Sequence, residues 1–196
     1  SDAWVRAAVA MKSVGPDGED AGTGHLQSVL QAEECATGPI ATLRLLFLTA
    51  QALQSIGKTG VPEVSVGPRM THRQNQIHES PFGSPSSFVA VDVLPVRKLY
   101  DPTIFRGYQA TVRCANTGSV ETFMKLWQEE CQQCPVSEGV AVVLGAGNVT
   151  GLAAADAVNQ IFEHGRAVLL KLHPVQSSLA PVFRAALKPL VEAGLL

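Results

Sequence analysis

The sequence has 196 residues, with 15 basic and 17 acidic side chains and a formal net charge of −2. This length predicts one domain, or one domain with an arm, that is large enough to bury a core. The balanced charge argues against a general nucleic-acid-binding protein, which needs a basic surface. No unbroken apolar run approaches the roughly 18 residues that a membrane helix requires. We therefore expect a soluble protein with no nucleic-acid partner and no membrane span.

Charged residues make up only 16% of the chain, against about 25% in typical soluble domains. This predicts that either other protein chains cover part of the surface, in a homo-oligomer or a larger complex, or part of the chain's own fold is absent. Residues 1–10 lack the basic and apolar segments of a secretory signal. The four cysteines do not form the pattern of a disulfide framework and favour a reducing compartment, either the cytoplasm or an organelle after removal of a transit peptide.

Residues 1–87 are predicted to form an N-terminal helical and extended arm. Residues 1–40 are weakly patterned, and the stretch 15–24 is typical of a loop. Residues 41–56 place their apolar side chains on one helical face, and Gly57 supplies a stop. Residues 57–87 are polar and contain four prolines, so we interpret them as a linker or as an arm lying on a neighbour.

Two strands and a helix are expected next. Residues 88–94 and 108–114 alternate as strands do, with a connector between them. Residues 119–134 fit an amphipathic helix capped by Ser119. Its apolar stripe includes Phe123, Trp127, Cys131 and Cys134 and is typical of core packing. A lone pair of cysteines on that stripe does not make a zinc site. His72, His78 and Glu79 lack metal-ligand spacing, so we expect no metal site.

From residue 139 onward the pattern becomes strand, helix, strand, helix. The expected bounds are 139–144, 152–164, 167–172 and 177–193, and Pro189 should kink the last helix. Unbroken apolar strands in this order predict a parallel, Rossmann-like sheet that is covered on both faces. The fold class is therefore α/β, with a partial nucleotide-binding domain over residues 88–196. Two parallel strands cannot bury both faces alone, so earlier strands, a continuation or another chain must complete the sheet.

The glycine turn, residues 145–151, separates the first of these strands from its helix. One interpretation is a dinucleotide-binding turn in which Gly145 and Gly147 admit a pyrophosphate. The spacing is a loose match, and the next strand ends at Lys171 without the acid that usually binds the ribose. Lys171 could instead bind a 2′-phosphate. The structural alternatives are glycines that allow close packing, Asn148 as a helix N-cap, and Lys171 as a surface side chain.

The order of these motifs resembles the aldehyde dehydrogenase superfamily. The Gly-x-Gly-Asn turn follows an apolar strand, a helix comes next, then a strand ending in Lys171 with Pro174 nearby, and finally a helix ending in Glu-Ala-Gly. Upstream motifs at 93–95, 99–101 and 105–107 resemble a branch related to acyl-CoA reductases. The resemblance covers roughly residues 88–196 and is weak before them.

The resemblance implies a catalytic role for Asn148, whose amide would stabilise the thiohemiacetal oxyanion. It also implies that Lys171 forms a hydrogen bond to the adenosine ribose of NAD or NADP. Pro174 stands where the family has a Glu, so the ribose site departs from the pattern. The family's catalytic Cys and general-base Glu have no counterpart in this sequence, which predicts that the chain alone is inactive.

Two functions follow from this resemblance. The chain is either the N-terminal, nucleotide-binding part of an NAD(P)-dependent aldehyde or acyl-CoA oxidoreductase, or a truncated, non-catalytic relative that serves as an accessory or scaffold subunit of a larger assembly. The low charge content and the long proline-bearing stretch favour the second function for this chain.

Overall fold

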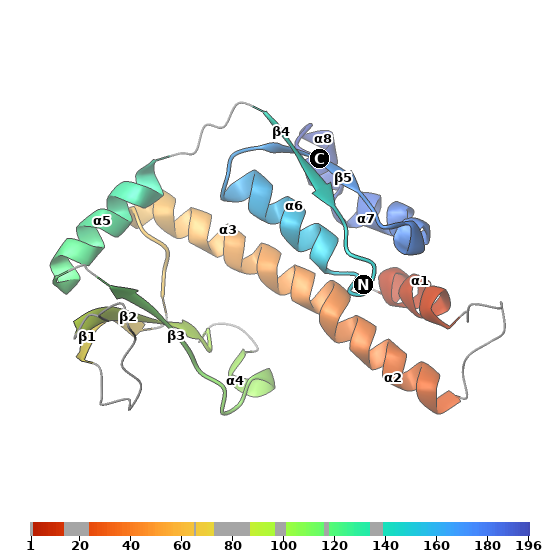
Figure 1. Cartoon of the computed structure of the whole chain (residues 1–196), viewed down its shortest axis with the longest axis horizontal. Helices are drawn as coiled ribbons and strands as arrows, with labels where there is room; N and C mark the ends of the chain where they lie inside the picture. Colours follow the sequence, from red (N-terminus) through yellow and green to blue (C-terminus); the bar gives the residue numbers. More distant parts are fainter. Residues whose placement is uncertain are drawn as a thin grey trace, which may run out of the picture. The chain divides into compact units, whose positions relative to one another are not determined.

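The computed structural model describes residues 2–13, 24–64, 66–72, 87–96, 101–115, 118–133 and 139–196. The chain divides into two compact units, the first formed by Ser1–Ala50 with Cys134–Leu196 and the second by Gln51–Gln133 (Figure 1). It belongs to the mixed α/β class, as expected. The first unit holds a two-stranded parallel sheet and the second a three-stranded antiparallel sheet, and no larger parallel sheet is evident in the described ranges. The division expected between residues 87 and 88 falls inside the second unit.

The parallel sheet of the first unit consists of β4 (Val140–Leu144) and β5 (Ala167–Lys171), paired residue for residue. The helix α6 (Leu152–Phe162) connects the two strands, as parallel pairing requires a crossover. Both predicted strands, the helix between them and their parallel direction are confirmed. Five-residue aliphatic strands and an alanine-rich helix pack closely because neither presents a bulky polar group at the contact.

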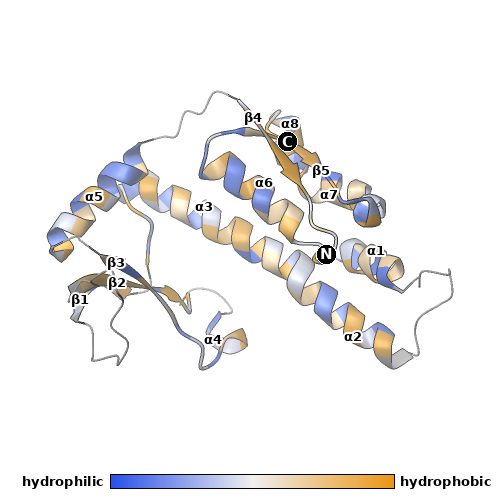
Figure 2. Ribbon diagram, viewed as in Figure 1, coloured by the Kyte–Doolittle hydropathy of each residue, from blue (hydrophilic) through white to orange (hydrophobic). Residues whose placement is uncertain are grey.

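Only one face of this sheet is covered by the described chain. Val143 and Val168 pack against Ala157 and Ile161 of α6 and are buried. The side chains of the other face, which we call the open face, are aliphatic and exposed: Val140 (65%), Val142 (63%), Leu144 (70%) and Leu169 (62%). Figure 2 shows both strands in the hydrophobic colour. The expectation that both faces are covered is therefore not met by these residues alone.

The segment after β5 is broken into three short helices: η2 (Pro174–Leu179), α7 (Ala180–Ala186) and α8 (Lys188–Glu192). The single kinked helix predicted over 177–193 is thus wrong in detail. The break falls at Leu187, just before Pro189, because a proline ring clashes with the preceding helical turn and lacks an N–H. Pro189 instead sits in the first turn of α8, where proline is tolerated.

The N-terminal part of the chain is more helical than its sequence suggested. α1 (Asp2–Lys12), α2 (Gly24–Cys35), the π-helical turn η1 (Ala36–Ile40) and α3 (Ala41–Thr59) follow one another. The helix predicted at 41–56 is confirmed, but the helices before it were not predicted. Residues 14–23, which hold most of the predicted loop, lie outside the described residues.

The core of the first unit is built around α1. Trp4 and Ala8 lie one helical turn apart and are buried against Leu179 and Phe183, with the Trp4 and Phe183 rings 4.7 Å apart. Ala153 of α6 joins the same cluster. The helix α1 therefore helps to fix the position of α6 and of the turn that precedes it.

The continuous helical segment Leu26–Thr59 is long and apolar enough, by length and composition, to cross a membrane. This segment contains polar side chains throughout, so it shows no unbroken apolar run in the sequence. One such helix is weak evidence for a membrane span, because core helices and signal sequences meet the same criterion. It ends at Thr59, just before Gly60, whose φ of 83° suits glycine, and not at the predicted Gly57.

The second unit contains β1 (Val66–His72), β2 (Ser87–Leu94) and β3 (Ala110–Ala115), paired antiparallel in that order. The strands predicted at 88–94 and 108–114 are confirmed, the second with shifted bounds. β1 corrects the view of 57–87 as an unstructured linker, because β2 supplies its partner from a distant part of the sequence. Residues 73–86, with His78 and Glu79, lie outside the described residues.

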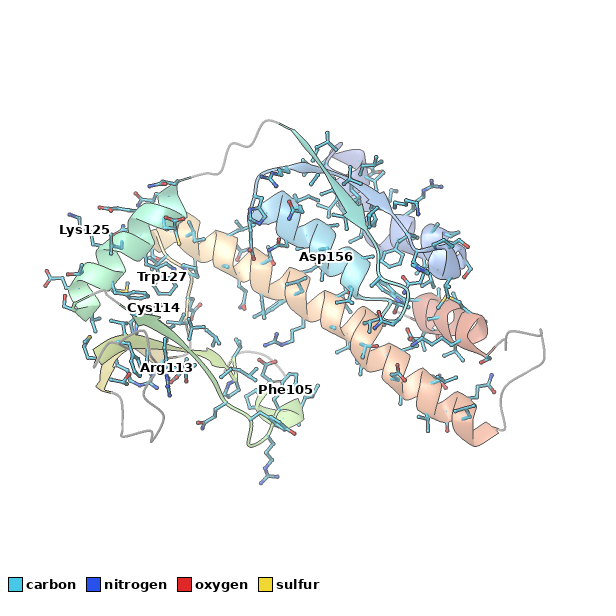
Figure 3. The ribbon with its side chains drawn as sticks, in the orientation of Figure 1. Phe105, Arg113, Cys114, Lys125, Trp127 and Asp156 are labelled. Atoms are coloured by element: carbon cyan, nitrogen blue, oxygen red, sulfur yellow. The ribbon has the colours of Figure 1, made fainter. Side chains whose placement is uncertain are left out.

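The helices of the second unit are α4 (Asp101–Ile104) and α5 (Val120–Gln132). Ser119 caps α5, accepting a hydrogen bond from the backbone N–H of Thr122 at 3.1 Å, as predicted. The predicted core stripe of α5 is confirmed for Phe123 and Trp127, whereas Cys131 does not join the core cluster and Cys134 lies outside the described residues. Phe123 and Trp127, with ring centroids 5.3 Å apart, join Val89, Val91 and Cys114 in one cluster. Trp127 and Cys114 are labelled in Figure 3.

Candidate functional site

The glycine turn and Lys171 meet at the carboxyl edge of the parallel sheet. The backbone N–H of Gly145 donates a hydrogen bond of 2.9 Å to the carbonyl of Lys171. This bond extends the pairing of β4 and β5 by one residue and ties the start of the turn to the end of the second strand. The structure thus places the backbone of Gly145 beside that of Lys171, at the ends of neighbouring parallel strands.

The glycines of the turn are required by close packing. A Cβ on Gly145 would lie 3.2 Å from the Cβ of Ala153, and one on Gly147 would lie 2.9 Å from Nδ1 of His173. At Gly151 an added Cβ would lie only 2.3 Å from the carbonyl oxygen of Thr37. This supports the alternative in which the glycines allow helix and loop segments to approach. The His173 ring fills the space beside Gly147, so that side of Gly147 is closed to a pyrophosphate.

Asn148 lies at the outer surface of the turn. Its residue is exposed, and the cap of α6 is Gly151, which makes no side-chain cap bond. The interpretation of Asn148 as the N-cap of this helix is therefore wrong, because the helix begins four residues later. An exposed amide that does not stabilise its own helix can hydrogen-bond a ligand or a partner chain.

Lys171 ends β5 on the open face, opposite Leu144. Its residue is exposed, and its ammonium group has neither a hydrogen-bond nor an ion-pair partner within the described ranges. It is the one charged side chain that strand alternation places on the open face. A free ammonium next to aliphatic side chains can bind a sugar hydroxyl or a phosphate. The same exposure is also typical of a surface lysine that binds no ligand.

His173 was not predicted as part of this edge. It caps η2, with Nδ1 accepting a hydrogen bond of 3.2 Å from the backbone N–H of Val175. The same ring packs against Gly147. A histidine two positions after a strand end carries no sequence pattern that distinguishes it from any loop histidine.

A buried polar cluster lies behind the glycine turn and was also not predicted. The hydroxyl of Thr150 donates to Oε2 of Glu34 at 2.8 Å and accepts from Nε1 of Trp4 at 3.1 Å. Glu34 is fully buried, and its other carboxylate oxygen pairs with Nζ of Lys12. The residues are too far apart in the sequence, 116 positions for Thr150 and Glu34, for any local motif to reveal them.

Lys12 completes this cluster by joining α1 to α2. Its ammonium group also lies 3.2 Å from Oε1 of Glu33. Burial alone lowers the pKa of Lys12, but hydrogen bonds and charge attraction from Glu34 and Glu33 outweigh it and raise the pKa above the ordinary value. Lys12 is therefore charged at neutral pH and compensates the buried carboxylate of Glu34.

Gln176 is a second buried polar side chain close to this edge. It lies in η2, three residues after His173, and is fully buried. Neither its amide nitrogen nor its amide oxygen has a hydrogen-bond partner among the described residues. Buried amides are normally paired, so this position destabilises the fold unless a water molecule or another group satisfies it.

The cysteines give no sign of an activated nucleophile. Cys35, Cys114 and Cys131 are free thiols, and Cys134 lies outside the described residues. Burial, and then the nearby charge of Glu130, raise the pKa of Cys131, which makes its thiolate scarcer. The described ranges contain no group of His, Cys, Asp or Glu side chains that could hold a metal ion.

Both edges of the parallel sheet are flanked by hollows. Beside β4 a hollow of about 440 Å³ is lined by the strand, by Arg166 and by polar side chains of α6, among them Asp156 (Figure 3). Beside β5 a more apolar hollow of about 490 Å³ is lined by Leu169, Phe183 and Val191. The backbone of β5 already makes one further contact, because the N–H of Val168 donates a hydrogen bond of 2.8 Å to the carbonyl of Leu195.

Comparison with known protein families, with characterised proteins and with solved structures found no match to this chain.

Proposed function

We propose that the first unit is part of an aldehyde-dehydrogenase-like nucleotide-binding domain that another polypeptide segment completes. The observation that carries the proposal is the Gly145–Lys171 hydrogen bond, which joins the Asn-bearing turn to the strand-end lysine. The resemblance in sequence rests on these same elements in the same order. The exposed positions of Asn148 and Lys171 leave both side chains available for a ligand.

In this proposal Lys171 hydrogen-bonds the adenosine ribose of NAD or NADP, and the nicotinamide ring accepts or supplies the hydride. The free ammonium of Lys171 fits this role, whereas Pro174 supplies no carboxylate for the ribose. Asn148 would donate its amide N–H to the oxyanion that forms when a thiolate adds to an aldehyde or an acyl thioester. The thiolate and the general base would come from a different polypeptide segment, so the isolated chain should be inactive.

The second candidate is a non-catalytic accessory or scaffold subunit. The open face favours it, because an apolar sheet face in water is a typical contact surface for another chain. The packing role of Gly145, Gly147 and Gly151 is consistent with it as well, since the turn then needs no nucleotide to explain its glycines.

Thermal unfolding with and without nucleotide separates the two candidates. A dinucleotide-binding chain should gain several degrees in Tm with NAD or NADP at about 100 times the dissociation constant, which corresponds to about 2.7 kcal/mol. Lys171→Ala should abolish the gain. Lys188→Ala, at an exposed lysine that pairs with Glu192 on its own helix, should retain it. No gain with either nucleotide at millimolar concentration would overturn nucleotide binding and leave the accessory subunit.

A further inference from the structure

The outer edge of β5, on the side away from β4, carries backbone groups that point out of the two-stranded sheet. In a parallel ladder, alternate residues direct their N–H and C=O groups to opposite neighbours. The carbonyl of Lys171 faces β4, because it accepts a hydrogen bond from the N–H of Gly145. The backbone groups of Val168 and Leu170 therefore face the outer edge, where a further strand would meet them.

One of these outward groups is already paired. The N–H of Val168 donates a hydrogen bond of 2.8 Å to the carbonyl of Leu195. The next two groups along the edge, the carbonyl of Val168 and the N–H of Leu170, have no backbone partner within the ranges that the structure describes. Val168 is buried and Leu170 half-buried, and backbone groups at such positions are normally paired. The edge thus holds the first hydrogen bond of a ladder without the following ones.

The chain approaches Leu195 in the same way as it approaches β5. After α6 comes Gly165, with a φ of 61°, and β5 begins two residues later at Ala167. After α8 comes Gly194, with a φ of 69°, and Leu195 follows it directly. A left-handed glycine ends a helix and turns the chain, and a helical crossover returns it parallel to the previous strand. Leu195 therefore lies where a strand parallel to β5 would start.

The space beside β5 is suited to an apolar strand. The hollow of about 490 Å³ at this edge has Leu196 in its lining, together with Phe183 of α7 and Val191 of α8. Its lining is apolar except for Ser177 and Arg184. Leu196 also packs against both core clusters of the first unit. The main chain at Leu196 thus lies at the hollow and is held there by the core.

We propose that Leu195 and Leu196 are the first residues of a third parallel strand, and that the hollow beside β5 takes an extended, mainly aliphatic segment directly continuous with them. A separate peptide is a poorer fit, because it would have to begin where the main chain of Leu196 lies. The existing hydrogen bond fixes the register. The residue after Leu196 donates its N–H to the carbonyl of Val168, and its carbonyl accepts from the N–H of Leu170.

This proposal deepens the proposed function by naming the edge, the direction and the register of a completing segment. It rests on that function only for the view that a further segment completes the sheet. Nucleotide binding plays no part in it.

The test adds the segment Val-Thr-Val-Thr-Val after Leu196 of the full chain and follows amide hydrogen exchange. Valine and threonine are strand-forming residues, and terminal addition leaves the existing core unchanged. The N–H of Leu170 should exchange at least about 10-fold more slowly than in the unextended chain, because it gains a hydrogen-bond partner. The urea midpoint of the first unit, followed by Trp4 fluorescence in a Trp127→Phe background, should rise.

Proline at two positions of the added segment provides the matched control. At the first added position proline removes the N–H that bonds the carbonyl of Val168, so most of the protection of Leu170 should disappear. At the second added position the N–H points away from β5, so proline should leave the protection largely intact. Each variant contains one proline, and a general effect of proline on the segment would lower the protection equally in both.

Three outcomes would overturn the proposal. The first is unchanged exchange of Leu170 in the extended chain, and the second is an equal loss of protection from the two prolines. The third is full protection of Leu170 by the same segment as a separate acetylated peptide at about 0.1 mM, well below the effective concentration that direct linkage supplies. That result would assign the edge to a separate chain.

The outcome is independent of the nucleotide experiment. Protection of Leu170 without a nucleotide-induced gain in Tm, in both the unextended and the extended chain, would count against nucleotide binding alone. A nucleotide-induced gain without protection of Leu170 would reject the third strand and leave nucleotide binding in place.

Discussion

The hydroxyl of Thr150 donates a hydrogen bond of 2.8 Å to the carboxylate of Glu34, and both side chains are fully buried. This bond links the end of the glycine turn to α2. Trp4 donates to the same hydroxyl oxygen, and Lys12 neutralises the carboxylate from its other side. A buried carboxylate is tolerated only when it is paired in this way, so the cluster should matter more for stability than surface polar contacts do.

Thr150→Val tests this cluster, because it removes the hydroxyl without changing the side-chain shape. We expect the first unit to lose about 2–3 kcal/mol, since the variant leaves a charged group and the Trp4 N–H without their partner. Urea unfolding followed by Trp4 fluorescence, in a Trp127→Phe background, reports this unit alone because the chain has only 2 tryptophans.

Thr111→Val is the matched control for this measurement. Thr111 also donates to a carboxylate, that of Asp92, at 2.8 Å, but at an exposed position of the second unit. We expect a loss of less than about 1 kcal/mol there, followed through Trp127. Equal losses for the two variants would contradict the importance of burial in the Glu34 cluster.

A second prediction concerns the glycines, which the structure separates into packed and open positions. Gly151→Ala would place a Cβ 2.3 Å from the backbone oxygen of Thr37, a clash that no side-chain rotation can relieve. We expect a loss of at least about 2 kcal/mol in the first unit. Gly57→Ala in α3 meets nothing within 4 Å and should stabilise the helix by about 0.5–1 kcal/mol. Urea midpoints of both variants check the two signs, and a stabilised Gly151→Ala variant would show that the turn is not packed as described.

A third prediction separates packing from function within the glycine turn. Gly147→Ala should destabilise the first unit by about 1–2 kcal/mol, because its Cβ would press on the His173 ring. Asn148→Ala should change stability by less than about 0.5 kcal/mol, since its residue is exposed and does not cap α6. A large loss from Asn148→Ala in the same unfolding experiment would assign Asn148 a structural role and weaken the proposal that it binds an oxyanion.

The elements that were predicted best are those whose apolar pattern is clear within the element itself. β4 and β5 are unbroken apolar runs, and α5 and α6 have a helical apolar period; the existence of all four and the parallel direction of the strands are confirmed. α1 was missed although Trp4, Val5, Ala8 and Val9 recur at helical spacing and are buried, and α2 has no buried apolar stripe that would have indicated it. β1 was missed because its partner strand lies beyond a polar, proline-bearing stretch.

The candidate site was predictable only in part. Positions after neighbouring parallel strands must share one edge, so the meeting of Gly145 and Lys171 follows from topology. The contacts that explain the glycines, with His173 and Thr37, come from loops whose course no local pattern determines. The same holds for Glu34, whose partner Thr150 is remote in the sequence.

The last prediction concerns the pH dependence of the second unit. Both oxygens of the Asp92 carboxylate accept hydrogen bonds from Arg69, at 2.7 and 2.9 Å, and Thr111 donates to the same carboxylate. The hydrogen bond from Arg69, and next that from Thr111, lower the pKa of Asp92 below its ordinary value. A lowered folded-state pKa stabilises the unit above the unfolded pKa of about 3.9, and this contribution is lost as the pH falls through the folded pKa.

Unfolding followed through Trp127, in a Trp4→Phe background, should therefore show stability falling from about pH 5 downward. Asp92→Asn should reduce the loss of stability between about pH 5 and lower pH, and Arg69→Gln should reduce it by a similar amount. The double variant should show no greater reduction than either single variant. Additive effects of the two substitutions would mean that Arg69 and Asp92 contribute to stability independently, because coupled partners share one contribution.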